Sequence, residues 1–298
     1  MTLFEGFASL DIEVGAARIH VRTAGEGPPV LLLHGYPQTM AMWSIVAPAL
    51  ARHHTVVCAD LRGYGRSRGP SRSRVDDFSF RTMAADQVAV MEELGHTRFD
   101  VIGHDRGGRT AHRMALDHPG RVTRLGVFDI APTMDMLLSI DRQTAAAYWH
   151  WFLLATPAPM PESLIGADAD RFFTTCFETW GATPIKNIGV EQLAEYRSAW
   201  TRPEVIHASC QDYRAALTID LEDDLADQDR VVECPTLAAW GTRGRIAALF
   251  DLRELWERRC HSVRCEQVPG GHFFVDERPG LTADLIADFL KEPLAVHA

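Results

Sequence analysis

Residues 103–107 read Gly-His-Asp-Arg-Gly, between an apolar run at 99–103 and a helix-like stretch at 107–116. A strand, a sharp turn and a helix in this order form a nucleophile elbow, which pushes its central side chain out at the edge of a sheet. Glycines suit the flanking positions because side chains there would collide with the turn. The pattern G-x-D-x-G also arises by chance, so the pattern alone is weak evidence. Its position between a predicted strand and a predicted helix makes Asp105 the candidate nucleophile. The alternative is that Asp105 only caps the following helix.

Short apolar runs alternate with helix-like segments along most of the chain. The runs that predict strands are 30–33, 55–59, 99–103, 125–130, 236–240 and 262–268, after two short strands within 8–23. This alternation predicts an α/β fold with a mostly parallel central sheet flanked by helices. Residues 132–227 break the pattern with aromatic and helical segments. We therefore expect a core domain of residues 1–131 and 228–298 and an inserted helical cap (lid) domain of residues 132–227.

Two further motifs lie where such a fold would complete a catalytic site. His-Gly-Tyr-Pro at 34–37 ends an earlier predicted strand, where the amides of Tyr36 and Arg106 can form an oxyanion hole. Gly-Gly-His-Phe at 270–273 follows the last predicted strand, which makes His272 the candidate catalytic histidine. The chain order nucleophile, acid, histidine indicates the α/β-hydrolase fold.

The acid of the triad can be placed by elimination. One usual position follows the strand at 236–240, but residues 241–245 include no carboxylate. The other follows the strand that ends near Phe128, and Asp129 stands there. We expect Asp129 to be the acid and keep Asp251 as the alternative.

An aspartate nucleophile restricts the chemistry. Carboxylate attack on an ester or amide would give an anhydride, whereas attack on a saturated carbon gives a stable alkyl ester. His272, oriented by Asp129, can then activate water against the carbonyl carbon of Asp105. The oxyanion that forms would face the amides of Tyr36 and Arg106. Halides and strained epoxides are the natural leaving groups.

Two arginines follow the candidate nucleophile. Arg106 and Arg109 stand one and four positions after Asp105, so a helix can bring both to one face near it. An arginine pair forms a fork suited to a carboxylate, and a chain of net charge −10 needs such a local basic site to bind an anion. A small 2-halo acid fits this arrangement. The alternative is that one of the arginines lies at the surface or in a salt bridge.

Composition limits the other classes of function. With 40 acidic and 30 basic residues, the chain is not suited to nucleic acid or an anionic membrane. The six cysteines include no C-x-x-C pair, so we expect reduced thiols, a cytoplasmic protein and no metal site. The first residues lack a basic segment and a long apolar segment, so we expect no signal peptide.

The segments GHDRGGR, YWHWFLLATPAPMPE, CQDYRA and GGHFFVDERP together resemble those of the fluoroacetate (haloacetate) dehalogenases. The resemblance covers essentially the whole chain, cap included. It implies that Asp105 is the nucleophile and that Asp129 and His272 complete the triad. It also implies that Arg106 and Arg109 hold the substrate carboxylate.

For the cap, the same resemblance implies that His150, Trp151 and Tyr213 bind the halide and that Trp180 shapes the pocket. The residues themselves do not reveal these roles, because Trp151 and Tyr213 alone are expected as core aromatics. Their N–H and O–H groups are compatible with a departing fluoride, which needs directed donors to replace its water shell. The resemblance further implies a homodimer and no metal or organic cofactor.

We therefore expect hydrolysis of a haloacetate, foremost fluoroacetate, to glycolate and halide, and two other functions stay open. An epoxide hydrolase shares the elbow aspartate and the H-G-x-P turn, but it uses cap tyrosines to protonate the epoxide oxygen. The only tyrosines of the predicted cap are Tyr148, Tyr196 and Tyr213. A hydrolase-fold receptor that binds a small carboxylate without catalysis is the other, and the complete triad argues against it.

Overall fold

The computed structural model describes residues 3–292 and has one central sheet of eight strands. The strands are β1 (Ala8–Val14), β2 (Ala17–Ala24), β3 (Pro29–Leu33), β4 (Thr55–Ala59), β5 (Phe99–His104), β6 (Val122–Phe128), β7 (Thr236–Gly241) and β8 (Val263–Val268). Their order in the sheet is β1-β2-β4-β3-β5-β6-β7-β8. The pairs β1–β2 and β2–β4 are antiparallel and all the others are parallel. The prediction of a mostly parallel sheet is confirmed.

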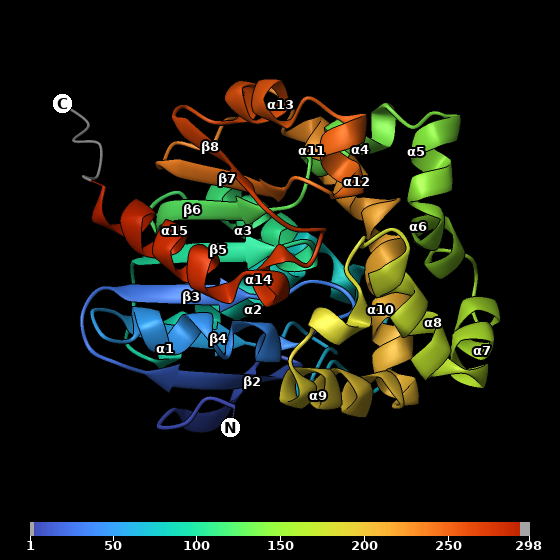
Figure 1. The fold of residues 1–298 in the computed structure, drawn as a ribbon, viewed down its shortest axis with the longest axis horizontal. Helices are drawn as coiled ribbons and strands as arrows, with labels where there is room; N and C mark the ends of the chain where they lie inside the picture. The colour runs from blue at the N-terminus through green and yellow to red at the C-terminus, as the bar shows by residue number, and fades with distance from the viewer. Residues whose placement is uncertain (1–2, 293–298) are drawn as a thin grey trace.

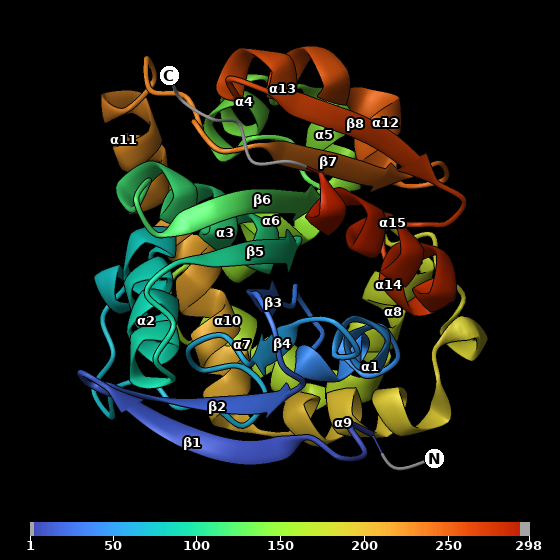
Figure 2. The same cartoon turned by 90° about the vertical axis from the view of Figure 1, so that its left-hand side faces the viewer.

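Helices cover both faces of this sheet. They are η1 (Met40–Trp43), α1 (Val46–Leu50), η2 (Asp76–Phe78), α2 (Phe80–Glu93), α3 (Arg106–Asp117), α12 (Arg245–Leu249), α13 (Leu252–Arg259), α14 (Phe274–Glu277) and α15 (Pro279–Lys291). Figure 2 shows α2 and α3 on one face, with α1, α14 and α15 on the other. Within the described part of the chain, every helix is too short or too polar to cross a membrane.

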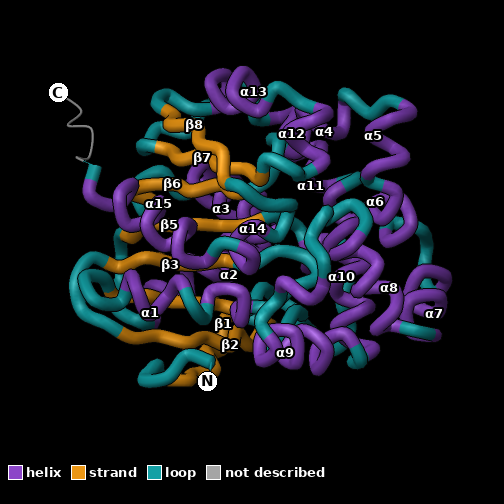
Figure 3. Tube along the Cα trace, viewed as in Figure 1, coloured by secondary structure: helices purple, strands orange, loops and turns teal. Residues whose placement is uncertain are grey.

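A second group of helices lies beyond the carboxyl ends of the parallel strands (Figure 1). It comprises α4 (Thr133–Leu138), α5 (Arg142–Ala147), α6 (Trp149–Leu154), α7 (Met160–Ala167), α8 (Ala169–Glu178), η3 (Ile185–Asn187), α9 (Val190–Trp200), α10 (Pro203–Ala216) and α11 (Ile219–Ala226). These helices are inserted between β6 and β7, and no strand interrupts residues 133–226. Figure 3 shows the strands gathered on one side of the molecule and most of the inserted helices on the other. We call the inserted group the cap helices.

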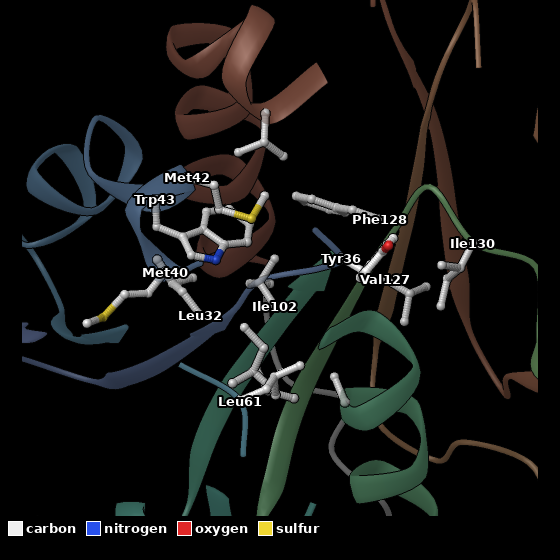
Figure 4. Close-up of a cluster of buried hydrophobic side chains, with 14 of the residues drawn as sticks. Leu32, Tyr36, Met40, Met42, Trp43, Leu61, Ile102, Val127, Phe128 and Ile130 are labelled. Carbon is white, nitrogen blue, oxygen red and sulfur yellow. The ribbon is translucent and has the colours of Figure 1, made fainter. Parts of the chain in front are cut away.

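Apolar side chains fill the space between the sheet and its helices. Strand β5 is buried along its whole length, as expected of a parallel strand covered on both faces. In Figure 4, Trp43 of η1 lies near Leu32, Ile102 and Phe128 from the three strands β3, β5 and β6. The rings of Trp43 and Phe128 are 6.4 Å apart between centroids. This packing links the three strands whose following turns form the site.

The turn from β5 into α3 leaves almost no free space. Asp105 has a positive φ of 46°, which is uncommon for a residue with a side chain. A Cβ added to Gly107 would lie 2.6 Å from the carbonyl carbon of Leu33, and one added to Gly103 would lie 2.6 Å from the amide nitrogen of Gly108. Sheet, turn and helix therefore touch through backbone atoms, which only glycine permits at these two positions.

The boundaries of two elements differ from the sequence-based expectation. Helix α3 begins at Arg106, directly after the nucleophile position. Strand β6 starts at Val122 and ends at Phe128, two residues before the expected end at Ile130. It ends there because Asp129 has a φ of 53°, which is incompatible with an extended strand.

Replacing Gly107 with alanine should lower the free energy of unfolding by about 3 kcal/mol, the upper end of the range for overpacking, because the atoms it meets are backbone. Gly120→Ala is the matched control, since a Cβ there has no described atom within 4 Å. Urea unfolding followed by circular dichroism measures both. Equal stability of the two variants would show that the elbow has room for a side chain.

Candidate active site

Asp105 lies at the start of α3 with its carboxylate turned away from the helix. Its Oδ1 accepts a hydrogen bond of 2.8 Å from the Tyr36 amide. The carboxylate makes no capping hydrogen bond, so the helix-cap alternative is wrong. Burial alone would raise the pKa of this carboxyl, but the charges of His272, Arg106 and Arg109 hold the pKa below its ordinary value. Asp105 is therefore ionised at neutral pH, as a nucleophile must be.

His272 is placed between two carboxylates. Its Nδ1 lies 2.6 Å from Oδ2 of Asp129, whose Oδ1 accepts a 2.7 Å hydrogen bond from the Gly241 amide. Its Nε2 lies 3.9 Å from Oδ2 of Asp105 and has no hydrogen-bond partner among the described residues. With the Nδ1 proton directed to Asp129, Nε2 presents a lone pair beside Asp105. This is the geometry of a general base that acts on a water molecule next to Asp105.

One backbone amide is hydrogen-bonded to the Asp105 carboxylate, and a second follows Asp105 directly in the chain. One is the Tyr36 amide already described. The other belongs to Arg106, the first residue of α3, whose amide has no acceptor within the helix. Gly35 allows this approach, because a Cβ there would lie 2.5 Å from the Cβ of Asp105. Both amides that the sequence assigns to an oxyanion hole thus lie at the elbow.

Arg106 is fully buried and ion-paired with Asp212 of α10. Its Nε donates to Oδ2 of Asp212 at 2.9 Å, and its Nη2 donates to Oδ1 and to the backbone carbonyl of the same residue. Burial would lower the pKa of this guanidinium, but Asp212 outweighs burial and raises it. Arg106 therefore lies in a salt bridge, which was the alternative to substrate binding. Its Nε and Nη2 are both bonded to Asp212 and are not free for a substrate. Only Nη1 has no partner among the described residues.

Arg109 differs from Arg106, because no carboxylate within the described residues pairs with its buried guanidinium. Its Nη1 donates to the carbonyl of Ala131 and to the hydroxyl of Thr133, and Nη2 lies 3.3 Å from the sulfur of Met136. Its Nε has no partner within the described chain. Burial and the neighbouring Arg106 lower the pKa of Arg109 to about 10, so it is charged at neutral pH. Arg109 is a buried cation that no carboxylate of residues 3–292 contacts in an ion pair, although the charge of Asp105 acts on it.

The aromatic residues assigned to halide binding form a cluster above the elbow. The rings of His150 and Trp151 lie 5.8 Å and 5.3 Å from that of Tyr213. The Nδ1 of His150 and the hydroxyl of Tyr213 are buried without a partner in the described chain. Burial lowers the pKa of His150 to about 3, so its ring is neutral. Trp180 stacks on His150 at 4.1 Å and meets His272 edge-on at 5.1 Å.

The structure also shows what the sequence missed. The fallback acid Asp251 is exposed and caps α13 through the Glu254 amide at 3.0 Å, so it is not part of this site. Asp212 was not singled out, although it stands beside Tyr213 in a buried helix, where a carboxylate needs a cation or donors. Among residues 3–292, no cluster of three histidine, cysteine, aspartate or glutamate side chains is arranged to hold a metal.

Comparison with known proteins agrees with this geometry. A fluoroacetate dehalogenase from Burkholderia sp is 50% identical over 97% of this chain and 96% of its own length, which confirms the resemblance seen in the motifs. A soluble epoxide hydrolase from Corynebacterium sp. (strain C12) is 33% identical over 93% of this chain and 94% of its own.

The fold comparison agrees as well. A putative alpha/beta hydrolase from Nostoc sp PCC 7120 superposes with a TM-score of 0.95 at 46% identity, covering 98% of this chain and 100% of the other. Residues 28–279 match the family model described as alpha/beta hydrolase fold. The chain therefore belongs to the α/β-hydrolase-fold family.

Proposed function

We propose that this protein is a haloacetate dehalogenase that hydrolyses fluoroacetate and related 2-halocarboxylates to glycolate and halide. The observation that carries the proposal is Arg109, a buried cation that no carboxylate of the described residues contacts in an ion pair, close to the ionised Asp105. A charge in such surroundings is costly unless it is paired, and a small carboxylate substrate would pair it. The identity to the Burkholderia enzyme supports the same substrate class.

In the first step, Asp105 displaces the halide. Tyr36 occupies Oδ1, which leaves Oδ2 to attack the halogen-bearing carbon. The new C–O bond forms as the carbon–halogen bond breaks, and its electron pair leaves with the halide. The carboxylate of the substrate binds Arg109 and the free Nη1 of Arg106. This contact places the halogen-bearing carbon in line with Asp105. The product is an ester on Asp105.

Donors from the cap receive the leaving halide in this proposal. The imidazole of His150, the indole of Trp151 and the hydroxyl of Tyr213 surround it, and Trp180 closes the pocket beside them. Fluoride is small and strongly hydrated, so it leaves a saturated carbon only when directed donors replace its water. The unpartnered Nδ1 of His150 and hydroxyl of Tyr213 are suited to that demand.

In the second step, water cleaves the ester. His272 takes a proton from water through Nε2, while Asp129 stabilises the imidazolium at Nδ1. The water oxygen attacks the carbonyl carbon of Asp105, and the negative charge that develops on Oδ1 faces the amides of Tyr36 and Arg106. The tetrahedral intermediate expels the glycolate oxygen, which takes the proton from His272. The carboxyl of Asp105 then releases a proton and is ready again.

The organisation of the chain enters the proposal as well. We assign residues 1–131 and 228–298, of which 1–2 and 293–298 lie outside the described residues, to the catalytic core domain and residues 132–227 to a cap domain that supplies the halide donors. A homodimer in the cytoplasm, without metal or organic cofactor, is part of the same proposal and rests on the resemblance to the dehalogenases.

Epoxide hydrolysis is the second candidate, favoured by the match to the Corynebacterium enzyme. It would use the same ester chemistry, with a cap tyrosine to protonate the epoxide oxygen. Tyr213 has a free hydroxyl near the site, but Arg109 would remain unpaired beside an uncharged epoxide. Turnover of styrene oxide with no halide release from haloacetates would reverse the ranking.

The variant His272→Asn should accumulate the ester, because alkylation does not need the histidine and hydrolysis does. Mass spectrometry of a digest after incubation with fluoroacetate should find the peptide that contains Asp105 heavier by one carboxymethyl group. The double variant Asp105→Ala/His272→Asn is the control and should stay unmodified. Recovery of only the unmodified peptide from His272→Asn would contradict covalent catalysis at Asp105.

Arg109→Gln should raise KM for chloroacetate by about 10- to 100-fold, since a charge-assisted hydrogen bond contributes about 1.5–3 kcal/mol. For the uncharged analogue chloroacetamide, KM should rise much less. Arg113→Gln is the matched control, because it removes a buried arginine one turn further along α3 that pairs with Asp117 and Asp227 instead. An equal loss on acid and amide would mean that Arg109 does not recognise the carboxylate.

A further inference from the structure

Three buried side chains are hydrogen-bonded to one another between the core and the cap. They are Arg106 at the elbow, Asp212 of the cap helix α10 and Tyr64 in the loop after β4. Arg106 donates to both carboxylate oxygens of Asp212, and the hydroxyl of Tyr64 donates to Oδ2 of the same carboxylate at 2.6 Å. Arg106 and Asp212 are fully buried, and Tyr64 is 2% exposed. Asp212 is thus satisfied by one cation and one hydroxyl, and it holds the guanidinium in a single plane.

This arrangement leaves the two arginines of the site unequal. Asp212 balances the charge of Arg106 and occupies all of its nitrogens except Nη1. Arg109 keeps its full charge, and both guanidinium groups lie about equally close to the ring of Trp151, at 5.1 Å and 4.8 Å. Arg109 is therefore the arginine whose guanidinium is left for a substrate carboxylate to contact directly. Arg106 contributes direction through its free Nη1, while the charge of Arg109 is not shared with a direct ionic partner in the described chain.

The ion pair also joins the immediate neighbours of two reacting groups. Arg106 follows Asp105 at the elbow, and Asp212 precedes Tyr213 on α10. The Arg106 guanidinium additionally lies 4.2 Å from the centre of the Tyr213 ring. A shift of α10 relative to α3 would therefore move the Tyr213 hydroxyl relative to the Asp105 carboxylate. In-line displacement needs these two groups on opposite sides of one carbon.

We propose that Asp212 is a positioning residue for dehalogenation: its ion pair with Arg106 fixes the halide donor Tyr213 against the nucleophile Asp105 and aims Nη1 of Arg106 at the substrate carboxylate. This inference rests on the proposed function. Asp212 touches neither substrate nor halide, so it acts only through Arg106 and through the position of α10.

The leaving group separates this role from a purely structural one. Fluoride depends on donors that are already in place, whereas bromide leaves readily without them. If α10 is held less firmly against α3, the turnover of fluoroacetate should therefore fall far more than the turnover of bromoacetate. A variant that merely contains less folded protein loses the same fraction of activity on both substrates, so the ratio of the two kcat values reports positioning.

The variant Asp212→Asn removes the charge and one acceptor while keeping the shape. Its kcat on fluoroacetate should fall by about 100-fold, the loss expected from a misplacement of about 1 Å. On bromoacetate it should fall by only a few-fold. Acetate should inhibit it more tightly than it inhibits the wild type, because the negative charge behind Arg106 is gone.

Asp220→Asn is the matched control on the next helix, α11. Asp220 is also buried, and its Oδ1 accepts from the Phe80 amide at 2.7 Å. Burial raises the pKa of this carboxyl well above its ordinary value, and asparagine keeps both the shape of the side chain and an acceptor for the Phe80 amide. This variant should keep the wild-type ratio of fluoroacetate to bromoacetate turnover and the wild-type affinity for acetate.

Tyr64→Phe keeps the test decisive if Asp212→Asn does not fold. It removes one hydrogen bond to Asp212 without changing any charge, so the same ratio of kcat values should fall by a few-fold. Wild-type ratios in each variant that folds would overturn the positioning role of Asp212 while haloacetate hydrolysis still stands. Absence of halide release by the wild-type protein itself would instead refute the proposed function.

Discussion

The site depends on the contact between backbone atoms at the nucleophile elbow. Gly107 lies directly against Leu33 at the end of β3, so the loop after β3 and the start of α3 cannot separate. This contact brings the Tyr36 amide to 2.8 Å from the Asp105 carboxylate. The positive φ of Asp105 is maintained by these surroundings, as backbone strain at active sites commonly is. Every other group of the site is placed relative to that one carboxylate.

Charge balance among buried side chains is the second constraint. Burial makes each unpaired charge costly, and two charged groups around the elbow have a direct ionic partner. Asp129 is paired with His272, and Arg106 is paired with Asp212. Arg109 remains, which explains how a chain of net charge −10 can attract an anion. The proximity of opposite charge decides binding here, and the overall charge of the protein does not.

The sequence predicts the sheet, the elbow and the order of the triad because these depend on local patterns: apolar runs, glycine spacing and a histidine after the last strand. It does not distinguish Arg106 from Arg109, because spacing on a helix says nothing about a partner more than a hundred residues away. Asp212 shows the same limit, since its role depends on how α10 packs on α3. The halide-binding roles proposed for His150, Trp151 and Tyr213 come from the family resemblance, and the free polar atoms of His150 and Tyr213 become visible only when the cap helices are in place.

The cap is joined to the core through a second buried carboxylate, and no cation of the described residues forms an ion pair with it. Asp276, four residues after His272, accepts hydrogen bonds from Gln38, Gln192 and Tyr196. Burial among neutral donors raises the pKa of Asp276 to about 7. These contacts tie α9 to the loop after β3 and to α14, and they use the Tyr196 hydroxyl. An epoxide could then be protonated only by the other cap tyrosines, so the contact that orders the cap also narrows the chemistry that the site can support.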